Sequence, residues 1–485
     1  MKRITTLFIF CATFWCSSCD VVNLDPISTL TEANFYKTAD DMDRAVLGIY
    51  NRYQSRLPRD WAIFEMPTDH LYMSAYRFIG GLEAVNTLDF QAQNDIFRNF
   101  WQTTYNGIFR ANVVISKLDN PTNYAPGQKE KFEGEARFMR ALFYFDLVRS
   151  FGGVPKVDQP LTVEGSKEVS RSSESEIYEF IVSDLKRAIE VLPPQNGTVH
   201  GRASKGAALA LLGKVYIYLK DWQNAYTYLT QVDEYGYGLM ENYADLWKEE
   251  HEDNKEAIFA IKYLAGSNGH RLSLDFLPYF GVEGISNSTG GEVALLAWSL
   301  HKKFLEEDSR KAATITEYWR SPGTDDPLEW KPFISKFMAQ QASTSGLDIP
   351  VIRYADVVLL KAEALYRLNR PEEALVELNK VRTRAFKGTS HNYSLADIAT
   401  PDQFLDVLLL ERQLELALEN QRWFDLVRTD RFVEVLSKVE WGYNPITGTA
   451  QEVTLSPKPF LRYFPIPQHE IDQANPGVIA QNEGY

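Results

Sequence analysis

The feature that most constrains the fold is a series of helical patterns separated by very short turns. Apolar residues recur at spacings of three and four through most of the chain, as in α-helices that bury one face. The helices predicted in this way span residues 40–54, 99–118, 129–150, 174–191, 204–219, 222–235, 351–368, 371–385 and 401–420. We therefore expect a mainly α-helical fold.

Some of these helices are joined so closely that they must lie antiparallel to each other. Residues 219–222 connect one pair, and residues 368–371 connect another. The second helix of each pair carries a small residue that permits close packing, Ala225 in one and Ala374 in the other. This arrangement is typical of the helix-turn-helix unit of tetratricopeptide repeats. The pairs are not contiguous, so one repeat array over the whole chain is not expected.

Less regular stretches lie between the helices. They span residues 57–95, 264–345 and 436–485, and the second is rich in glycine. A segment of this length without regular structure, inside a compact domain, is usually functional. We therefore expect a loop-rich ligand-binding region at about residues 264–345.

The first residues have the pattern of an export signal that ends in lipid attachment. Lys2 and Arg3 precede an uncharged run of about 12 residues, which is too short to span a bilayer and fits a secretory signal. Small residues directly precede Cys19, as in bacterial lipoproteins whose cysteine is acylated. We predict a signal peptide at residues 1–18, lipidation of Cys19 and a tether at residues 19–31. The alternative is an ordinary secretory signal that leaves Cys19 as a free thiol.

Charge and cysteine content exclude several classes of protein. The three cysteines all lie within the first 19 residues, so the mature domain has no internal disulfide. The formal net charge of −14 becomes −16 when residues 1–18, with Lys2 and Arg3 and no acidic residue, are removed. Such a chain lacks the clustered cations that nucleic-acid binding requires. It also lacks a basic patch for docking on anionic lipid.

Signatures of metal or nucleophilic catalysis are missing from the sequence. No two of the seven histidines lie within five residues of each other, and there is no HExxH, G-x-S-x-G, Walker or EF-hand pattern. We therefore expect no catalytic residue, no metal and no cofactor.

Three carboxylates deserve a separate interpretation. Glu411, Glu415 and Glu419 are spaced by four residues on a predicted helix. A glycoside hydrolase needs a pair of such groups as acid and as base or nucleophile. Arginines lie close by in the sequence, however, and their planar guanidinium groups pair with carboxylates in buried networks. We favour the ion network.

The aromatic residues of the irregular stretches are the candidates for ligand binding. A flat aromatic ring covers the apolar face of a sugar, while polar groups bind its hydroxyls. The candidates are Trp61, Tyr72, Tyr76, Phe78, Tyr279, Trp298, Trp319 and Trp330. Each one alone is more often a core residue than a sugar platform, but we expect at least two of them to line the site.

Several segments, in order, resemble the SusD/RagB family of surface nutrient-binding lipoproteins of Bacteroidota. They include NFYKT at residues 34–38, GEARFMRALFYFDLVRSFGGVP at 134–155, GRASKGAALALLG at 201–213 and RYADV at 353–357. Others are LNKVR at 378–382, ERQLELA at 411–417 with RWFDL at 422–426, and FPIP at 464–467. The resemblance covers nearly all of the mature chain and is weakest at residues 57–98 and 264–345.

The resemblance implies a SusD-like fold in which four tetratricopeptide-like helix pairs form a scaffold beside an irregular ligand-binding region. It implies an N-terminal region at 32–235 and a C-terminal region at 236–485. It also implies a non-catalytic lipoprotein on the outer-membrane surface, which passes an oligosaccharide to a SusC-like TonB-dependent transporter. The alternatives are a peptide-binding member of the same family, an exported glycoside hydrolase and a periplasm-facing adaptor that binds only protein.

Overall fold

The described part of the protein is mainly helical, as the periodicity predicts. The computed structural model describes residues 35–485 except 76, 78, 195–199, 287–288 and 339–343. The predicted signal peptide, Cys19, the tether, Tyr76 and Phe78 lie outside the described residues. Small antiparallel sheets of two strands occupy the regions between the helices.

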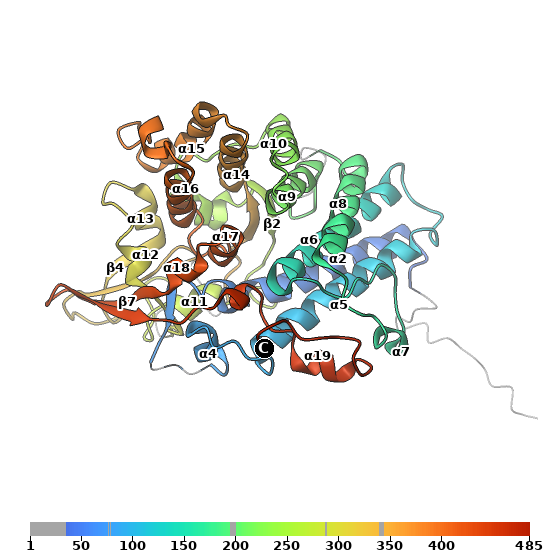
Figure 1. Ribbon diagram of the computed structural model, residues 1–485, viewed down its shortest axis with the longest axis horizontal. Helices are drawn as coiled ribbons and strands as arrows, with labels where there is room; N and C mark the ends of the chain where they lie inside the picture. The colour runs from blue at the N-terminus through green and yellow to red at the C-terminus, as the bar shows by residue number, and fades with distance from the viewer. Residues whose placement is uncertain (1–34, 76, 78, 195–199, 287–288, 339–343) are drawn as a thin grey trace, which may run out of the picture.

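Long helices form a continuous row in which each packs against the next (Figure 1). In order they are α2 (Ala39–Arg56), α5 (Asp95–Lys117), α6 (Gln128–Phe151), α8 (Glu174–Val191), α9 (Lys205–Tyr218), α10 (Trp222–Gln231), α14 (Tyr354–Arg367) and α15 (Pro371–Ala385). Taken two at a time, they give the four helix pairs that the resemblance implies.

The two pairs with short turns have the same local geometry. The turn between α9 and α10 places Lys220 at φ 57°, and the turn between α14 and α15 places Asn369 at φ 60°. Ala225 and Ala374 are fully buried in the two pairs. A β-carbon on Gly213 would lie 2.5 Å from the side chain of Leu229, so α9 and α10 approach as closely as a glycine permits.

Helix α6 lies in the centre of the N-terminal half and is buried on several sides, as expected. It packs against α2, α5, α8 and α9. A β-carbon on Gly107 of α5 would lie 2.2 Å from the ring of Phe143, so this glycine is what brings the two helices together. At the start of α2, Thr38 and Asp41 form a capping box.

Four predicted helix boundaries are wrong by three or more residues. Helix α5 begins at residue 95 and not at 99, and α10 ends at residue 231 and not at 235. Residues 351–353, assigned to a helix from the sequence, belong to strand β6 (Ile349–Arg353), which pairs with β2 (Ala257–Ile261). Their β-branched side chains favour a strand once a partner strand is available. Helix α16 (Pro401–Glu415) ends five residues before the predicted 420, and Leu418 and Asn420 follow it with positive φ.

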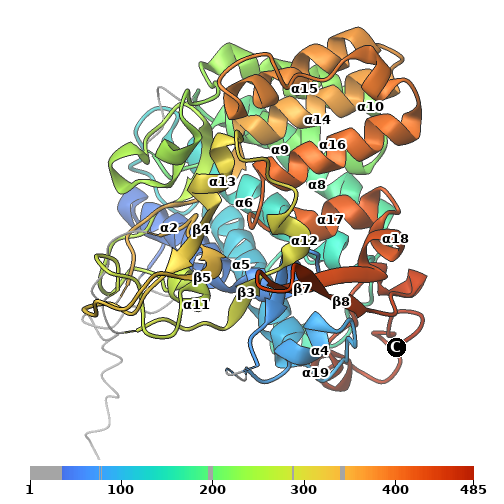
Figure 2. The ribbon, with the colours of Figure 1, turned by 90° about the vertical axis from the view of Figure 1, so that its left-hand side faces the viewer.

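Short elements build the rest of the described chain. They are α3 (Trp61–Phe64), β1 (Leu71–Met73), α4 (Leu82–Asn86), α7 (Val163–Ser166), α11 (Leu272–Phe276), β3 (Ala294–Leu296), α12 (Trp298–His301), α13 (Ser309–Thr314), β4 (Ile315–Trp319), β5 (Glu329–Ile334), α17 (Arg422–Arg428), α18 (Phe432–Leu436) and α19 (Gln468–Gln473). The C-terminal stretch also contains a hairpin, β7 (Lys438–Asn444) and β8 (Thr449–Thr454), which projects from the body (Figures 1 and 2).

A buried ion network joins these regions, as the ion-network interpretation predicts. Glu411 pairs with Arg310 at 2.6 Å, and Glu415 pairs with Arg384 at 2.6 Å. Glu419 pairs with Arg353 at 2.7 Å. The side chains of all three glutamates are at most 7% exposed. Arg353 and the turn after α16 are thereby fixed against each other.

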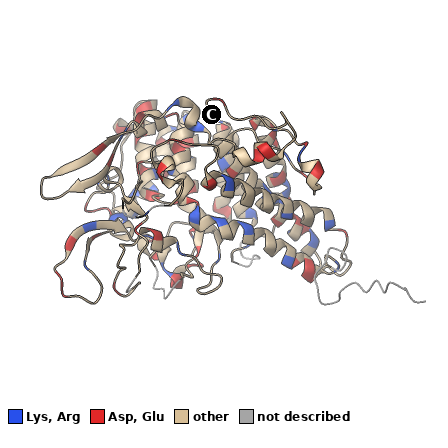
Figure 3. Ribbon diagram, turned by 90° about the horizontal axis from the view of Figure 1, so that it is seen from below, with Lys and Arg blue, Asp and Glu red and all other residues tan. Residues whose placement is uncertain are grey.

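Charged residues of both signs are interspersed along the helices in the view of Figure 3. No large basic face is visible in this view, in agreement with the net charge of the chain. Among the described helices, none combines the length and the hydropathy of a membrane-spanning segment.

Candidate ligand-binding site

An open hollow of about 250 Å³ lies where β1, α12, β5 and β7 meet. These elements come from four distant parts of the sequence, and each contributes aromatic side chains. The rings that line the hollow are Tyr72, Phe276, Trp298, His301, Trp330, Phe333, Trp441 and Tyr443. Three of them, Tyr72, Trp298 and Trp330, are candidates from the sequence.

Trp298 is held between two parallel rings. Tyr443 stacks at 3.9 Å between ring centroids, with 10° between the planes, and His301 stacks at 4.6 Å with 19°. Two parallel rings this close would overlap if they lay on one face, so they cover opposite faces of the indole. His301 reaches its face because residues three apart on a helix lie above one another. Both faces of the Trp298 indole are therefore covered by other rings. Only the edge of the indole is left for a ligand to contact.

The other rings differ in orientation and offer surface to a ligand. Tyr72 and Trp441 are parallel to within 7°, with centroids 5.9 Å apart. Trp330 meets the stacked rings almost edge-on, at 69° to both Trp298 and Tyr443. The hollow thus has aromatic groups in two nearly perpendicular orientations. Such a corner can cover one face and one edge of a sugar ring.

Strand geometry separates Trp330 from Trp319. In the β4–β5 ladder Trp330 pairs with Tyr318, while Trp319 pairs with Glu329. Successive side chains of a strand point to opposite faces, so Trp319 and Trp330 lie on opposite sides of this hairpin. Trp319 packs against a small cluster that contains Leu277 and donates its indole N–H to the Gly281 carbonyl at 2.8 Å. Trp319 is therefore outside the lining of the hollow.

The polar groups at the hollow are few and already paired. Glu292 binds Lys331 at 3.0 Å and accepts a hydrogen bond from the Tyr279 backbone N–H at 2.7 Å. His301 Nε2 lies 2.9 Å from Glu317. Glu292 is the one carboxylate among the described residues that line the hollow. A second carboxylate, which glycoside hydrolysis requires, is not among them.

Burial shifts the pKa values of two side chains that line the hollow, His301 and Tyr72. Burial lowers the pKa of His301, against the opposing effect of Glu317, so the imidazole is neutral at pH 7. The Glu317 carboxylate can only accept, so the Nε2 of His301 carries the proton. Burial also raises the pKa of the Tyr72 hydroxyl, and the nearby charge of Glu292 adds to this effect. Tyr72 therefore stays a hydrogen-bond donor at any physiological pH.

Two other candidates lie away from the hollow. Trp61 is only 4% exposed and packs edge-on against Phe276, so its ring belongs to the core and offers no platform. Tyr279 is 45% exposed, and the guanidinium of Arg77 lies 4.1 Å above its ring. Tyr279 touches the hollow only through the contact of its backbone with Glu292.

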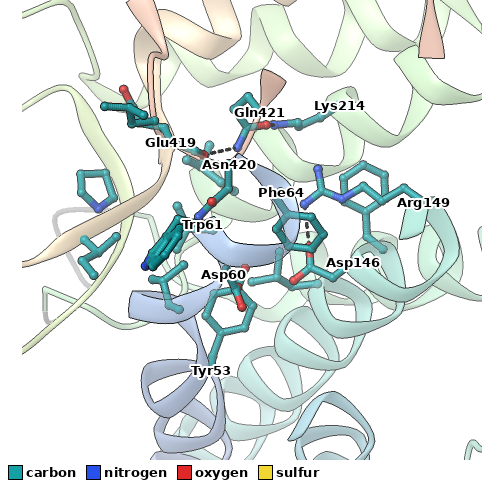
Figure 4. A pocket seen from close by; sticks show the side chains of 18 of the residues that line it. Tyr53, Asp60, Trp61, Phe64, Asp146, Arg149, Lys214, Glu419, Asn420 and Gln421 are labelled. Atoms are coloured by element: carbon teal, nitrogen blue, oxygen red, sulfur yellow. Dashed lines mark hydrogen bonds and ion pairs between the residues drawn. The ribbon is translucent and has the colours of Figure 1, made fainter. Parts of the chain in front are cut away.

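Trp61 instead borders a second, interior cavity of about 50 Å³ (Figure 4). This cavity lies between α3, α6 and the turn at residues 418–421, and charged side chains reach into it. Asp146 binds Arg149 at 2.6 Å, and Lys214 binds Gln421 at 2.6 Å. The volume is enough for a few water molecules and too small for a sugar residue.

Trp441 and Tyr443 are the rings of the hollow that sequence reasoning missed. Their stretch was treated as irregular because it is rich in proline. A signal was present nevertheless, since Trp441 and Tyr443 alternate with other residues and are followed by the turn sequence NPITG. Both rings line the hollow, and the β7–β8 pairing shifts its register between Glu440 and Tyr443, so regular alternation alone does not place them there. What the sequence did not reveal is which distant elements these rings meet.

Metal binding finds no support in the described residues. No group of three or more His, Cys, Asp or Glu side chains is arranged there so that it could hold a metal ion.

Comparison with known proteins agrees with this architecture. The SusD family model matches residues 328–485, and a model described as starch-binding associating with outer membrane matches residues 28–217. SusD-like protein P38 of Formosa agariphila is 27% identical over 94% of this chain and 95% of its own length. The starch-binding protein SusD of Bacteroides thetaiotaomicron is 22% identical over 76% of this chain and 75% of its own.

Solved structures extend the likeness to the fold. A laminarin-binding SusD-like protein has a TM-score of 0.76 and 26% identity, covering 93% of this chain and 100% of its own. A SusD-like protein from Bacteroides fragilis has a TM-score of 0.79 at 22% identity, covering 94% and 99%. The ordered sequence motifs, the row of helix pairs, the two family models and these full-length likenesses agree: the chain is similar to the SusD/RagB family along nearly its whole length.

Proposed function

We propose that this protein is a non-catalytic glycan-binding lipoprotein of the cell surface. It captures an oligosaccharide in the aromatic hollow and delivers it to a SusC-like TonB-dependent transporter in the outer membrane. The observation that carries the proposal is the hollow itself, in which Tyr72, Trp330 and Trp441 offer aromatic surface beside a few polar groups. A laminarin-binding relative of the same fold and a starch-binding relative support the choice of a glycan over a peptide.

Lipid on Cys19 is the proposed means of attachment. The first helix, α2, begins at Ala39, which leaves some twenty residues between the acylated cysteine and the helical body. At up to about 3.4 Å per residue, this stretch of chain could span several tens of ångströms. The body can therefore act as a lid over a transporter while it stays attached to the membrane.

A binding screen tests the glycan function. The Cys19→Ala protein, which keeps the whole domain, is applied to an array of oligosaccharides and peptides and then studied by calorimetry. We expect at least one oligosaccharide to bind without being cleaved. Binding of peptides alone would favour the peptide-binding alternative, and release of shortened sugars would favour the hydrolase.

Membrane attachment is tested in cells. We expect Cys19→Ala to abolish retention in the membrane fraction and growth on the cognate glycan, whereas Ser17→Ala, a change between small residues, retains both. Protease treatment of intact cells should degrade the wild-type protein. Retention of the Cys19→Ala protein would overturn the lipid anchor, and protection from protease would favour a periplasmic adaptor.

A further inference from the structure

The hollow has no charged group without a partner among the described residues. The ammonium of Lys331 lies 3.0 Å from Glu292 and also 4.8 Å above the ring of Trp319. The ammonium is therefore held between a carboxylate of the hollow and a ring on the outer side of the hairpin. Glu292 is 12% exposed at its side chain, and its second oxygen is bound to the backbone of Tyr279. A ligand carboxylate or sulfate would have to compete with Glu292 for this single cation.

Cations next to the hollow are paired in the same way. Lys302 forms an ion pair with Glu440, and Arg320 lies 3.7 Å from Glu283. His301 carries no positive charge at pH 7, because its burial lowers its pKa. An anionic ligand would therefore compete with a carboxylate for Lys302 and for Arg320.

The β4–β5 hairpin adds negative charge. Asp325, Asp326 and Glu329 lie in its loop and at the start of β5 and are exposed, with no ion pair found for them in the described part of the chain; Glu329 lies on the Trp319 side. Arg77, whose guanidinium is stacked on Tyr279, contributes one positive charge, and these three acids contribute three negative charges. The whole chain carries a net charge of −14. An anionic glycan would therefore meet a repulsive field before it reached the rings.

The cost of desolvation also disfavours an anionic glycan. A charged substituent that enters an apolar pocket loses hydration, and only a partner that is itself free can compensate for this loss. The rings of the hollow provide apolar surface, and its paired charges provide no such partner. The hydroxyl groups of a sugar lose less hydration free energy than a charged substituent does. They can also donate hydrogen bonds to a carboxylate that is already in an ion pair, because its oxygens can accept more than one hydrogen bond.

We propose that the hollow selects uncharged oligosaccharides and discriminates against uronate-containing or sulfated ones. This inference rests on the proposed glycan function and adds the class of ligand. In this role the Glu292–Lys331 pair determines specificity, since it neutralises the one cation that could otherwise recruit an anionic sugar.

Matched ligands test the selection. Neutral gluco-, manno- and galacto-hexaoses are compared by calorimetry with the same chains oxidised at C6 to polyuronates, using the Cys19→Ala protein. We expect at least one neutral hexaose to bind, and its polyuronate to bind at least tenfold more weakly. Affinity for the neutral chain should change less than twofold between 50 mM and 500 mM NaCl, because no net charge is involved.

A charge variant tests the specificity pair. Glu292→Gln leaves Lys331 without its carboxylate, so we expect the ratio of polyuronate to neutral affinity to rise at least threefold. The double variant Glu292→Gln/Lys331→Met removes both charges and should return the ratio to the wild-type value. Circular dichroism confirms that both variants are folded.

The outcomes separate the two proposals. If a polyuronate binds as well as its neutral counterpart or better, glycan binding stands and the neutral selection is overturned. If the ratio does not change in Glu292→Gln, the role of the Glu292–Lys331 pair is overturned. If neither series binds, the glycan function fails, and the inference fails with it.

Discussion

The aromatic hollow and the interior cavity differ in the side chains that surround them. The cavity is surrounded by buried arginine, lysine and carboxylate side chains that hold distant segments in place, among them Asp146, Arg149 and Lys214. The hollow is surrounded by rings, and its few charges are neutralised locally. Buried charges therefore determine the shape of the molecule, whereas aromatic surface determines what it can bind. Each prediction below tests one side of this comparison.

The largest effect is expected in the ion network. Arg353 is 2% exposed and contacts Glu256, Glu415 and Glu419. Arg353→Met would remove the cation that these three buried carboxylates share, and Arg384 and Lys336 would compensate for it only in part. We therefore expect it to lower the free energy of unfolding by about 3–5 kcal/mol. Urea denaturation measures this change.

An exposed pair provides the matched control. Arg44 and Asp40 lie four residues apart on α2, with side chains 64% and 70% exposed. Arg44→Met should cost less than about 0.5 kcal/mol, because surface pairs contribute little. Equal effects of the two substitutions would show that burial is not what makes the network important.

The next largest effect is the pH dependence of stability that comes from Asp275, which lies between the hollow and the interior cavity. Asp275 accepts a hydrogen bond from Trp61 of the interior cavity at 3.2 Å, and its neighbour Phe276 lines the hollow. Burial raises the pKa of Asp275 to about 6, from an ordinary value of 3.8. Between these two values the folded protein holds a proton that the unfolded chain has lost. The contribution of Asp275 to the stability of the wild type therefore falls as the pH rises from about 4 to 6.

Asp275→Asn should remove this dependence while it keeps an acceptor for Trp61. We expect the variant to gain up to about 3 kcal/mol in the free energy of unfolding, relative to the wild type, between pH 4 and pH 7. Thermal unfolding at a series of pH values measures the difference. A constant difference between the two proteins across this range would contradict the assignment.

The smallest expected effect in free energy is the loss of one binding ring. Trp441→Ala removes a ring of the hollow, and we expect at least a tenfold loss of affinity for a neutral oligosaccharide that the wild type binds, about 1.4 kcal/mol. Trp319→Ala is the matched control, because this ring lies on the outer side of the β4–β5 hairpin. It should lower the melting temperature yet change the affinity less than threefold. A larger loss of affinity in Trp319→Ala would place the site on the other side of the hairpin.

Sequence reasoning worked best where a signal is local. The helices, the capping box at Thr38 and Asp41, and the close packing at Ala225 and Ala374 all follow from spacings of a few residues. It failed at Val351, where the pairing of β6 with β2 outweighs the helical pattern. That pairing joins residues almost a hundred positions apart in the chain, so no local pattern could reveal it.

The candidate site shows the same division. Aromatic content indicated which stretches carry ligand-binding rings, and Tyr72, Trp298 and Trp330 do line one hollow. Composition could not distinguish Trp330 from Trp319, because strand pairing alone places them on opposite faces. It could not identify Trp441 either, because a ring becomes part of a site only through the elements it meets.

The sequence by itself determined the helical class, the family resemblance and the acidic, cysteine-free body, since these depend on composition, local periodicity and ordered motifs. Only the tertiary structure decided which rings face the hollow, which of their faces stay free and which charges are already neutralised. Trp298 shows why, because Tyr443, which stacks on one of its faces, comes from β7, more than a hundred residues away in the chain. Such contacts arise from long-range packing, which short-range sequence patterns do not encode.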